Sequence, residues 1–173
     1  MPIIALIGPS GAGKSTLVDR YVSEHPDALF HKSVTTRPVR SRDDTSHRFL
    51  TDEEFDAAER EGTLLQSIEA YGYRYALPLL PDDKGRVIIV MIRQQFVDGF
   101  VQLYPHAHII HIEASVDTLV QRLTQRGDAS RIDAAALASE LQLGRHKSHT
   151  TISTDEPFAS SYAHFVAACQ LLA

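Results

Sequence analysis

The chain has 173 residues, of which 43% are hydrophobic, and a formal net charge of -5. This length and composition suffice for one compact domain with a buried core. The negative charge argues against non-specific binding to nucleic acid or to an anionic membrane as its main task. A single cysteine, Cys169, excludes a disulfide within the chain and a cysteine-rich metal cluster.

The first residues lack the succession of basic, apolar and cleavage-site segments that marks a leader peptide. No apolar stretch approaches the roughly 20 residues that a helix needs to span a bilayer. We therefore expect a cytoplasmic protein without membrane or nucleic-acid partners. The sequence leaves open whether it is a monomer or a homodimer.

The most specific motif follows a predicted strand at residues 3–7 and begins a predicted helix at Lys14. It reads Gly-Pro-Ser-Gly-Ala-Gly-Lys-Ser-Thr, with the spacing of a phosphate-binding P-loop. Glycines let the backbone fold around an anion, so that N–H groups and a helix N-terminus point at phosphate oxygens. Lys14 is predicted to contact the β- and γ-phosphates, and the Ser15 hydroxyl to ligate Mg²⁺. The predicted nucleoside triphosphate site comprises Gly8, Ser10, Gly11, Ala12, Gly13, Lys14, Ser15 and Thr16.

Beyond this motif, predicted strands and helices alternate along most of the chain. Thr51 and Glu54 form a capping-box pattern, which predicts a helix that continues to Gly62. The other predicted elements are a strand at 29–35, antiparallel strands within 64–80, strands at 87–92 and 108–112, and helices at 94–103, 116–125 and 158–172. The alternation favours an α/β fold with a parallel sheet, interrupted by an inserted lobe.

A cluster of arginines follows the strand predicted at 29–35. Arg37, Arg40 and Arg42 are closely spaced, and guanidinium groups bind phosphate oxygens through paired hydrogen bonds. The cluster therefore indicates an acceptor that carries its own phosphate. The alternative is a solvated basic loop that Asp43 and Asp44 partly balance.

Together, the P-loop, the segment Ser-Val-Thr-Thr-Arg-Pro at 33–38, and Glu69 with Tyr75 resemble the guanylate kinase family. The resemblance runs through most of the chain, including the helix that begins at Thr51-Asp-Glu-Glu-Phe and the stretch from Arg122 to Arg126 near the expected lid. It implies one domain over 1–173 with the three-layer α/β fold of P-loop NTPases around a central parallel sheet. The implied parts are a core at 1–35 and 82–173, an inserted monophosphate-binding lobe at about 36–81, and a short lid at about 126–148.

The resemblance also implies a reaction, the transfer of phosphate from ATP to GMP with Mg²⁺. It assigns the acceptor phosphate to Arg37 and Arg40, with a further contact from Tyr75 or, as the alternative, Tyr73. His47 stands where the family carries an aromatic phosphate ligand.

Two further positions correspond to the residues with which the family reads guanine, Ser33 and Glu69. A carboxylate there can accept hydrogen bonds from the N1–H and the exocyclic amine of guanine, a pair of donors that adenine lacks on that edge. The resemblance therefore favours GMP as the small-molecule acceptor.

The chain departs from the family pattern at the end of the strand at 87–92. Met91 and Arg93 stand where the family has two aspartates, so a carboxylate expected near Mg²⁺ is missing. In the lid, Arg126 matches the first family arginine. The second falls within an alanine run, so Arg131 or Arg145 has to substitute. With Lys14, we predict Arg126 and Arg131 as the catalytic cations.

These departures leave two alternatives open. The ribose 1,5-bisphosphate phosphokinases, a sister group, also lack the aspartate pair, and their acceptor is a phosphorylated sugar without a base. A guanylate kinase-like domain that binds a nucleotide or a protein without transfer is the other alternative. Turnover that depends on an acceptor would distinguish a kinase from such a domain.

Several remaining polar residues are interpreted as structural. His106, His108 and His111 lie beside or in a predicted strand, where packing or surface roles explain them better than a metal site. His146 is expected in a loop, and Asp155 is expected to cap the last helix.

Overall fold

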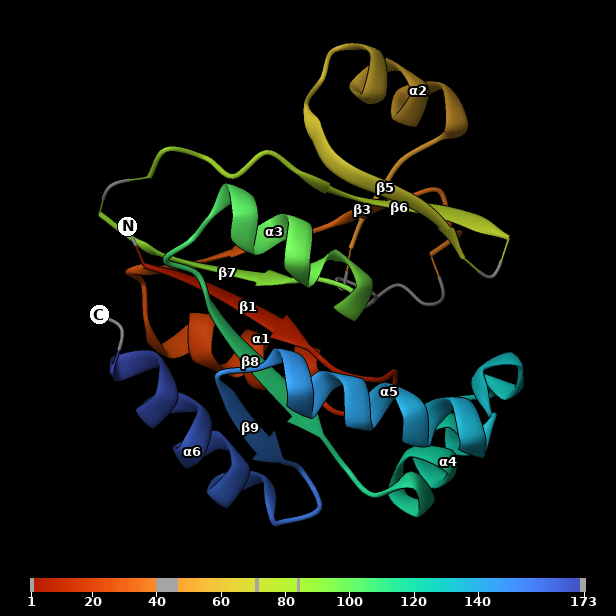
Figure 1. The fold of residues 1–173 in the computed structure, drawn as a ribbon, viewed down its shortest axis with the longest axis vertical. Coiled ribbons are helices and arrows are strands. Elements are labelled where there is room, and N and C mark those ends of the chain that lie inside the picture. Colours follow the sequence, from red (N-terminus) through yellow and green to blue (C-terminus); the bar gives the residue numbers. More distant parts are fainter. Residues whose placement is uncertain (1, 40–46, 71, 84, 172–173) are drawn as a thin grey trace. The chain divides into compact units, whose positions relative to one another are not determined.

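The structure is a computed structural model that describes residues 2–39, 47–70, 72–83 and 85–171 (Figure 1). The chain divides into two compact units. Unit 1 comprises Met1–Phe30 and Gly85–Ala173, and unit 2 comprises His31–Lys84. Within the described ranges, none of the helices is long and apolar enough to cross a membrane.

Unit 1 is built on a parallel sheet in the order β2-β7-β1-β8-β9. Its strands are β1 (Ile3–Ile7), β2 (Ala28–His31), β7 (Val87–Met91), β8 (His108–Glu113) and β9 (Thr150–Ser153). β1 is central, pairing Leu6 with Met91 of β7 and with Ile110 of β8. All five residues of β1 are buried, which explains why its sequence is a continuous apolar run.

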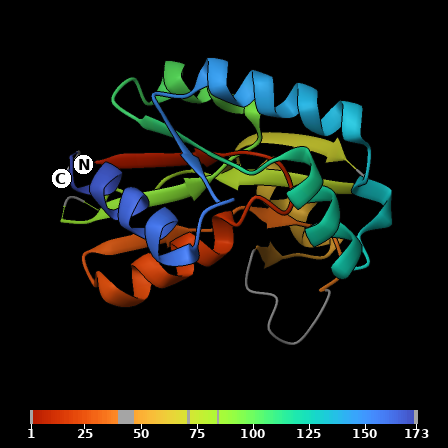
Figure 2. The same cartoon turned by 90° about the horizontal axis from the view of Figure 1, so that it is seen from below.

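Helices cover both faces of this sheet. They are α1 (Lys14–Glu24), α3 (Val97–Leu103), α4 (Val116–Gln125), α5 (Ala134–Lys147) and α6 (Phe158–Gln170), with short 3₁₀ helices η1 (Gln94–Phe96) and η2 (Ala129–Arg131). Figure 2 shows α1 and α6 on one face and α3 and α5 on the other. The core fills the space between them, with Phe100 and Phe165 almost fully buried. This arrangement confirms the expected α/β fold with a central parallel sheet.

Unit 2 contains a second sheet, in the order β4-β3-β6-β5, and one helix. Its elements are β3 (Val34–Thr35), β4 (Arg48–Phe49), α2 (Asp52–Arg60), β5 (Leu64–Ala70) and β6 (Tyr73–Pro78). The capping box is confirmed, because Thr51 Oγ1 accepts from the Glu54 N–H and Glu54 accepts from the Thr51 N–H. Phe55 of α2 is fully buried against Val34 and Ala76 of the sheet.

The structure corrects several local expectations. The strand expected at 29–35 is two strands, β2 and β3, which belong to different sheets. β9 was not predicted, and His146 lies in α5 rather than in a loop. α6 begins after Pro157, while Asp155 accepts a hydrogen bond from Ser115 N–H at the start of α4. Asp155 therefore links the segment after β9 to the start of α4, rather than capping α6.

Candidate active site

The P-loop connects the end of β1 to the start of α1, and its backbone requires glycine. Gly8, Gly11 and Gly13 have φ angles of 136°, 86° and 90°, a region that L-residues other than glycine rarely adopt. A Cβ atom on Gly8 would lie 2.0 Å from the carbonyl oxygen of Ile112, so a side chain has no room there. Of the two other predicted residues in this turn, Ser10 is half-buried and Ala12 is fully buried.

A side chain distant in sequence holds the outer part of this loop. Arg122 of α4 donates to the carbonyl oxygen of Gly11 at 3.1 Å and to that of Thr154 at 2.7 Å. The Thr154 hydroxyl in turn donates to the carbonyl oxygen of Ala12 at 2.9 Å. These bonds fix the carbonyl groups of Gly11 and Ala12 in the loop. Sequence reasoning did not assign Arg122 a role, because the contact joins residues about a hundred positions apart.

Lys14, the first residue of α1, folds back over the loop. Its ammonium donates to the carbonyl oxygens of Gly8 at 2.6 Å and Pro9 at 2.9 Å. Burial lowers the pKa of Lys14 to about 8, and the Glu140 carboxylate opposes that shift. A phosphate that accepts from this ammonium would replace two neutral carbonyls with an anionic partner.

The three candidate lid arginines differ in what they contact. One contacts the P-loop, one acts on Lys14 through its charge, and the third binds a carboxylate outside the loop. Arg131, at the end of η2, donates to the Ser10 hydroxyl of the P-loop at 2.8 Å. Arg126 is exposed at the end of α4, and its charge also lowers the pKa of Lys14. Arg145 instead makes a two-pronged ion pair with Glu113, at 2.6 and 3.0 Å. The geometry therefore brings Arg131, rather than Arg145, to the loop.

The residues available for Mg²⁺ are few. Ser15, in the first turn of α1, is half-buried, and Thr16 beside it is exposed. The described part of the chain contains no group of three or more His, Cys, Asp or Glu side chains that could hold a metal ion. A hydroxyl combined with phosphate oxygens and water is a ligand set that Mg²⁺ accepts. Ser15 therefore fits a metal ion that arrives together with a triphosphate.

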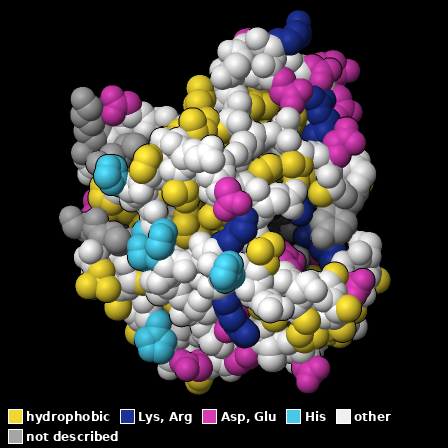
Figure 3. Space-filling view, viewed as in Figure 1, with side chains coloured by type: hydrophobic (Ala, Val, Ile, Leu, Met, Phe, Trp, Pro, Cys, Tyr) yellow, Lys and Arg dark blue, Asp and Glu magenta, His cyan; other side chains and the backbone are white. Residues whose placement is uncertain are grey.

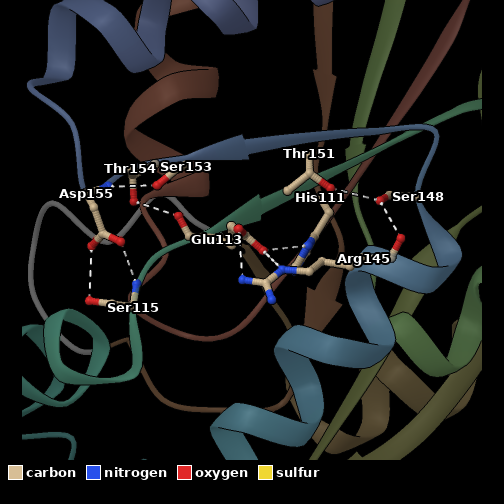
Figure 4. Close-up of polar contacts among 9 residues, drawn as sticks. All are labelled: His111, Glu113, Ser115, Arg145, Ser148, Thr151, Ser153, Thr154 and Asp155. Carbon is tan, nitrogen blue, oxygen red and sulfur yellow. Dashed lines mark hydrogen bonds and ion pairs between the residues drawn. The ribbon is translucent and has the colours of Figure 1, made fainter.

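A buried histidine lies directly behind the P-loop. His111 of β8 is fully buried, and its Nδ1 is 3.5 Å from the Glu113 carboxylate, which also binds Arg145 (Figure 4). A Cβ on Gly144 of α5 would lie 2.3 Å from His111 Nε2, and one on Gly8 would lie 3.4 Å from its Cδ2. Burial lowers the pKa of His111 to about 4. His111 is therefore a neutral ring that spaces α5 from the P-loop, in agreement with the predicted packing role.

In unit 2, a cationic and aromatic cluster forms on one face of the small sheet. Arg37 is buried, and its guanidinium lies 5.1 Å from the ring centroid of Phe49. The His47 ring packs edge-on against Tyr75, with centroids 5.8 Å apart. Thr35 pairs with both Phe49 and Tyr75, so these side chains share a face. The structure thus brings together three of the predicted acceptor residues: Arg37, His47 and Tyr75.

Glu69 does not join this cluster. It pairs with Arg74, whereas its neighbour Ile68 pairs with Tyr75, so Glu69 and Tyr75 lie on opposite faces. Arg74 forms ion pairs with Asp56 and Glu59 of α2, at 2.6 Å each. Figure 3 shows such acidic and basic side chains side by side over α2.

The polar residue of β5 on the Tyr75 face is Gln66. Gln66 pairs with Leu77, two residues from Tyr75, in a run of pairs that continues without a break from Gln66 to Ala70 at the hairpin turn. The sequence predicted antiparallel strands here but not their pairing register, which explains why Gln66 was missed.

Of the other predicted acceptor residues, Ser33 is half-buried, and its carbonyl oxygen accepts from Arg48 N–H at 2.9 Å. Tyr73, the alternative to Tyr75, is exposed on β6. Arg40 lies outside the described residues.

The α2 face of unit 2 also has an open cavity of about 370 Å³. Glu69, Arg74 and Asp52 line it together with Thr36, Pro38, Gly72 and Tyr73. Glu69 therefore lines a polar hollow, and Arg37, His47 and Tyr75 are not among its lining residues.

Known proteins with similar sequences and folds are kinases. A family model described as an AAA domain matches residues 3–149. A ribose 1,5-bisphosphate phosphokinase of Brucella melitensis is 34% identical over 146 residues, covering 80% of this chain and 75% of that protein. A guanylate kinase of Thermosynechococcus vestitus is 35% identical over 135 residues, covering 74% of this chain and 71% of that protein.

The chain belongs to the guanylate kinase-like family. A crystal structure of guanylate kinase from Anaplasma phagocytophilum has the same fold, with a TM-score of 0.72 and 21% identity over 98% of this chain and 85% of that chain. Both groups of sequence relatives are kinases, so this guanylate kinase-like chain is a phosphotransferase. The relatives divide between a nucleotide and a sugar acceptor, and the finer assignment depends on the site.

Proposed function

We propose that the protein transfers the γ-phosphoryl group of ATP to a small acceptor that already carries a phosphate. The observation that carries this proposal is the P-loop, in which three glycines of positive φ form a phosphate cradle beside Lys14. Loop N–H groups and the N-terminus of α1 bind the β-phosphate. Ser15 is the residue that would hold Mg²⁺, and the ion when bound would supply positive charge beside the phosphates.

The acceptor phosphate is held by Arg37, with contacts from His47 and Tyr75. A guanidinium can bind two phosphate oxygens at once and keeps its charge at any useful pH. An acceptor phosphate is itself anionic near neutral pH, so it needs no strong general base. Arg40 is proposed as a second phosphate ligand by the family resemblance alone.

Transfer proceeds directly and in line. An oxygen of the acceptor phosphate forms a bond to the γ-phosphorus, while the bond from that phosphorus to the β–γ bridging oxygen breaks, and ADP leaves. Charge spreads over the γ-phosphoryl oxygens in the transition state, where fixed cations lower its energy. Lys14, Arg126 and Arg131 supply these cations.

GMP is the first candidate acceptor. The Ser-Val-Thr-Thr-Arg segment and the cyanobacterial guanylate kinase at 35% identity support it. In this version Ser33 and Glu69 read guanine, which requires Glu69 to reach the base from the α2 face of unit 2.

Ribose 1,5-bisphosphate is the second candidate, and a specific observation favours it. Glu69, the residue expected to read guanine, lies on the face of the small sheet opposite Tyr75 and therefore opposite the Arg37 cluster. A sugar bisphosphate has no base to read and needs cations and neutral hydrogen-bonding groups. Arg37 and Gln66 have this character, and the Brucella relative supports the same acceptor.

The test is ADP release from ATP–Mg²⁺ in parallel reactions with GMP, AMP, CMP, UMP, ribose 1,5-bisphosphate and no acceptor. Stimulation by GMP alone supports guanine reading, and stimulation by the sugar bisphosphate supports the second candidate. Nucleotide binding without stimulation by any acceptor would contradict both and favour a non-catalytic binding domain.

A further inference from the structure

Arg93 stands at the end of β7, where the family resemblance leads one to expect a carboxylate. β7 pairs with β1 as far as Met91 opposite Leu6, and the Ile92 N–H then donates to the Leu6 carbonyl oxygen at 3.0 Å. Arg93 therefore follows the strand beside the point where β1 ends and the P-loop begins. Its backbone is extended, with φ -79° and ψ 146°, and η1 starts directly after it.

The Arg93 side chain carries its charge into the surroundings of Lys14. Arg93 is half-buried, and its charge, like those of Arg126 and Arg131, lowers the pKa of the Lys14 ammonium, although burial is the larger cause. Glu140 is the acid whose charge opposes this effect. Arg93 thus adds positive charge near Lys14, beside the glycine-rich loop. Positive charge at this place suits a polyanion.

The sign of the side chain's charge at this position decides which partner it can bind. A carboxylate at the end of β7 could hold Mg²⁺ or its water, whereas a guanidinium has no lone pair for a metal and repels it. A guanidinium instead offers a planar set of N–H donors that matches phosphate oxygens. Arginine at this position therefore replaces a group that can bind the metal with a group that can bind phosphate.

We propose that Arg93 binds the γ-phosphoryl oxygens of ATP and stabilises their charge during transfer. This inference rests on the proposed function and adds a residue to its site. Arg93 makes no covalent bond. It donates hydrogen bonds to the γ-phosphoryl group while the acceptor oxygen bonds to phosphorus and the bond to the bridging oxygen of ADP breaks.

The test compares two nucleotides that differ by the γ-phosphate. Calorimetry on the full chain with Mg²⁺ measures the Kd of ADP and of a non-hydrolysable ATP analogue for wild type, Arg93→Ala and Arg93→Lys. We expect Arg93→Ala to weaken analogue binding by about 10- to 100-fold, the usual worth of hydrogen bonds between charged groups, with ADP affinity within about twofold. Arg93→Lys restores part of the loss because it keeps the charge.

Arg20→Ala is the matched control, because this exposed arginine of α1 pairs with Glu24 in unit 1. It should change neither Kd. An Arg93→Ala variant that binds the analogue normally, or that loses affinity for both nucleotides equally, would overturn the assignment. A wild-type chain that binds both nucleotides but transfers to no acceptor overturns the proposed kinase activity, while the affinity comparison still decides the role of Arg93.

Discussion

The P-loop of unit 1 and the small sheet of unit 2 define their binding groups in different ways. In the P-loop, contiguous residues create the site, and the main contribution comes from backbone N–H groups that any sequence with the right glycines presents. In the small sheet, the groups come from separate strands, and the pairing register decides which side chains share a face. Gly8 shows the first case, with no room for a Cβ, and Glu69 shows the second.

The difference has a general consequence for assigning function from sequence. A motif made of adjacent residues keeps its geometry as long as the backbone can adopt it. A site that depends on strand alternation changes completely when the register moves by one residue. Residue type therefore supports the proposed nucleotide site more securely than it supports the proposed acceptor site.

The largest effect is expected at the P-loop. Lys14→Ala removes the ammonium that lies over the loop and should lower the rate of ADP formation by on the order of 10²- to 10³-fold. The control is Lys147→Ala. It removes the ammonium at the end of α5 that pairs with Asp98 of α3 at 2.8 Å, and it should keep activity within about twofold. A Lys14→Ala variant with near-normal turnover would disprove the assignment of the loop.

Arg37→Ala tests the acceptor face of unit 2. The KM for the acceptor should rise by about 10- to 100-fold through loss of a charged hydrogen-bond donor, while the KM for ATP stays within about twofold. Arg48→Ala is the matched control, because Arg48 pairs with Val34 and so belongs to the opposite face of the same sheet. Since Arg37 is buried, a thermal melt of each variant checks the fold. Unchanged acceptor kinetics in a folded Arg37→Ala variant would refute this role.

A smaller effect separates the two faces of β5. If ribose 1,5-bisphosphate is the acceptor, Gln66→Ala should raise its KM by about 3- to 10-fold, the usual worth of one neutral hydrogen bond, while Glu69→Ala should change it by less than about twofold. Both variants are assayed with GMP and with ribose 1,5-bisphosphate. A loss of GMP-dependent turnover in Glu69→Ala alone would instead support the GMP candidate, in which Glu69 reads guanine.

The smallest effect on activity, but a measurable one on stability, is expected at His111. Its pKa is about 4 in the folded chain and about 6.5 when unfolded, so the unfolded state binds more protons between these values. Stability is therefore fully present above pH 6.5 and is lost as the pH falls toward 4, by roughly 3 kcal/mol. Urea unfolding at pH 7.0 and 4.5 should show a smaller difference for His111→Gln than for wild type.

The exposed histidine variant His164→Gln serves as the control for this measurement, because the His164 side chain is 64% exposed. Its pH dependence should match that of wild type. Equal pH dependence in wild type and His111→Gln would show that the buried ring does not govern acid stability.

Sequence reasoning recovered the parts of the fold that depend on local patterns. The apolar run of β1, the glycine spacing of the P-loop and the capping box at Thr51 each report a short-range physical requirement. It failed where the decisive contact is distant: β9 is a strand because it pairs with β8, and Arg122 matters because it reaches Gly11.

The arrangement of the acceptor residues could be predicted only in part, because it also depends on contacts between separate strands. Arg37, His47 and Tyr75 were expected to act together, and alternation and proximity bring them to one face, while their role stays a prediction. The faces of β5 could not be deduced, because they depend on the register in which β5 pairs with β6 across the hairpin turn. Arg93 was visible in the sequence, but only as a missing carboxylate. Its closeness to Lys14 emerges from the parallel pairing of β7 with β1.

The bonds from Arg122 to the carbonyl oxygens of Gly11 and Thr154 also have a kinetic meaning. A loop already held in its curved shape does not have to be ordered by an incoming nucleotide. The conformational entropy of the loop is therefore lost during folding and not on binding. Arrival of the nucleotide is then set by diffusion and electrostatic attraction, and its residence time by contacts with the phosphates. Differences in affinity among P-loop variants of this chain should accordingly appear as differences in dissociation rate.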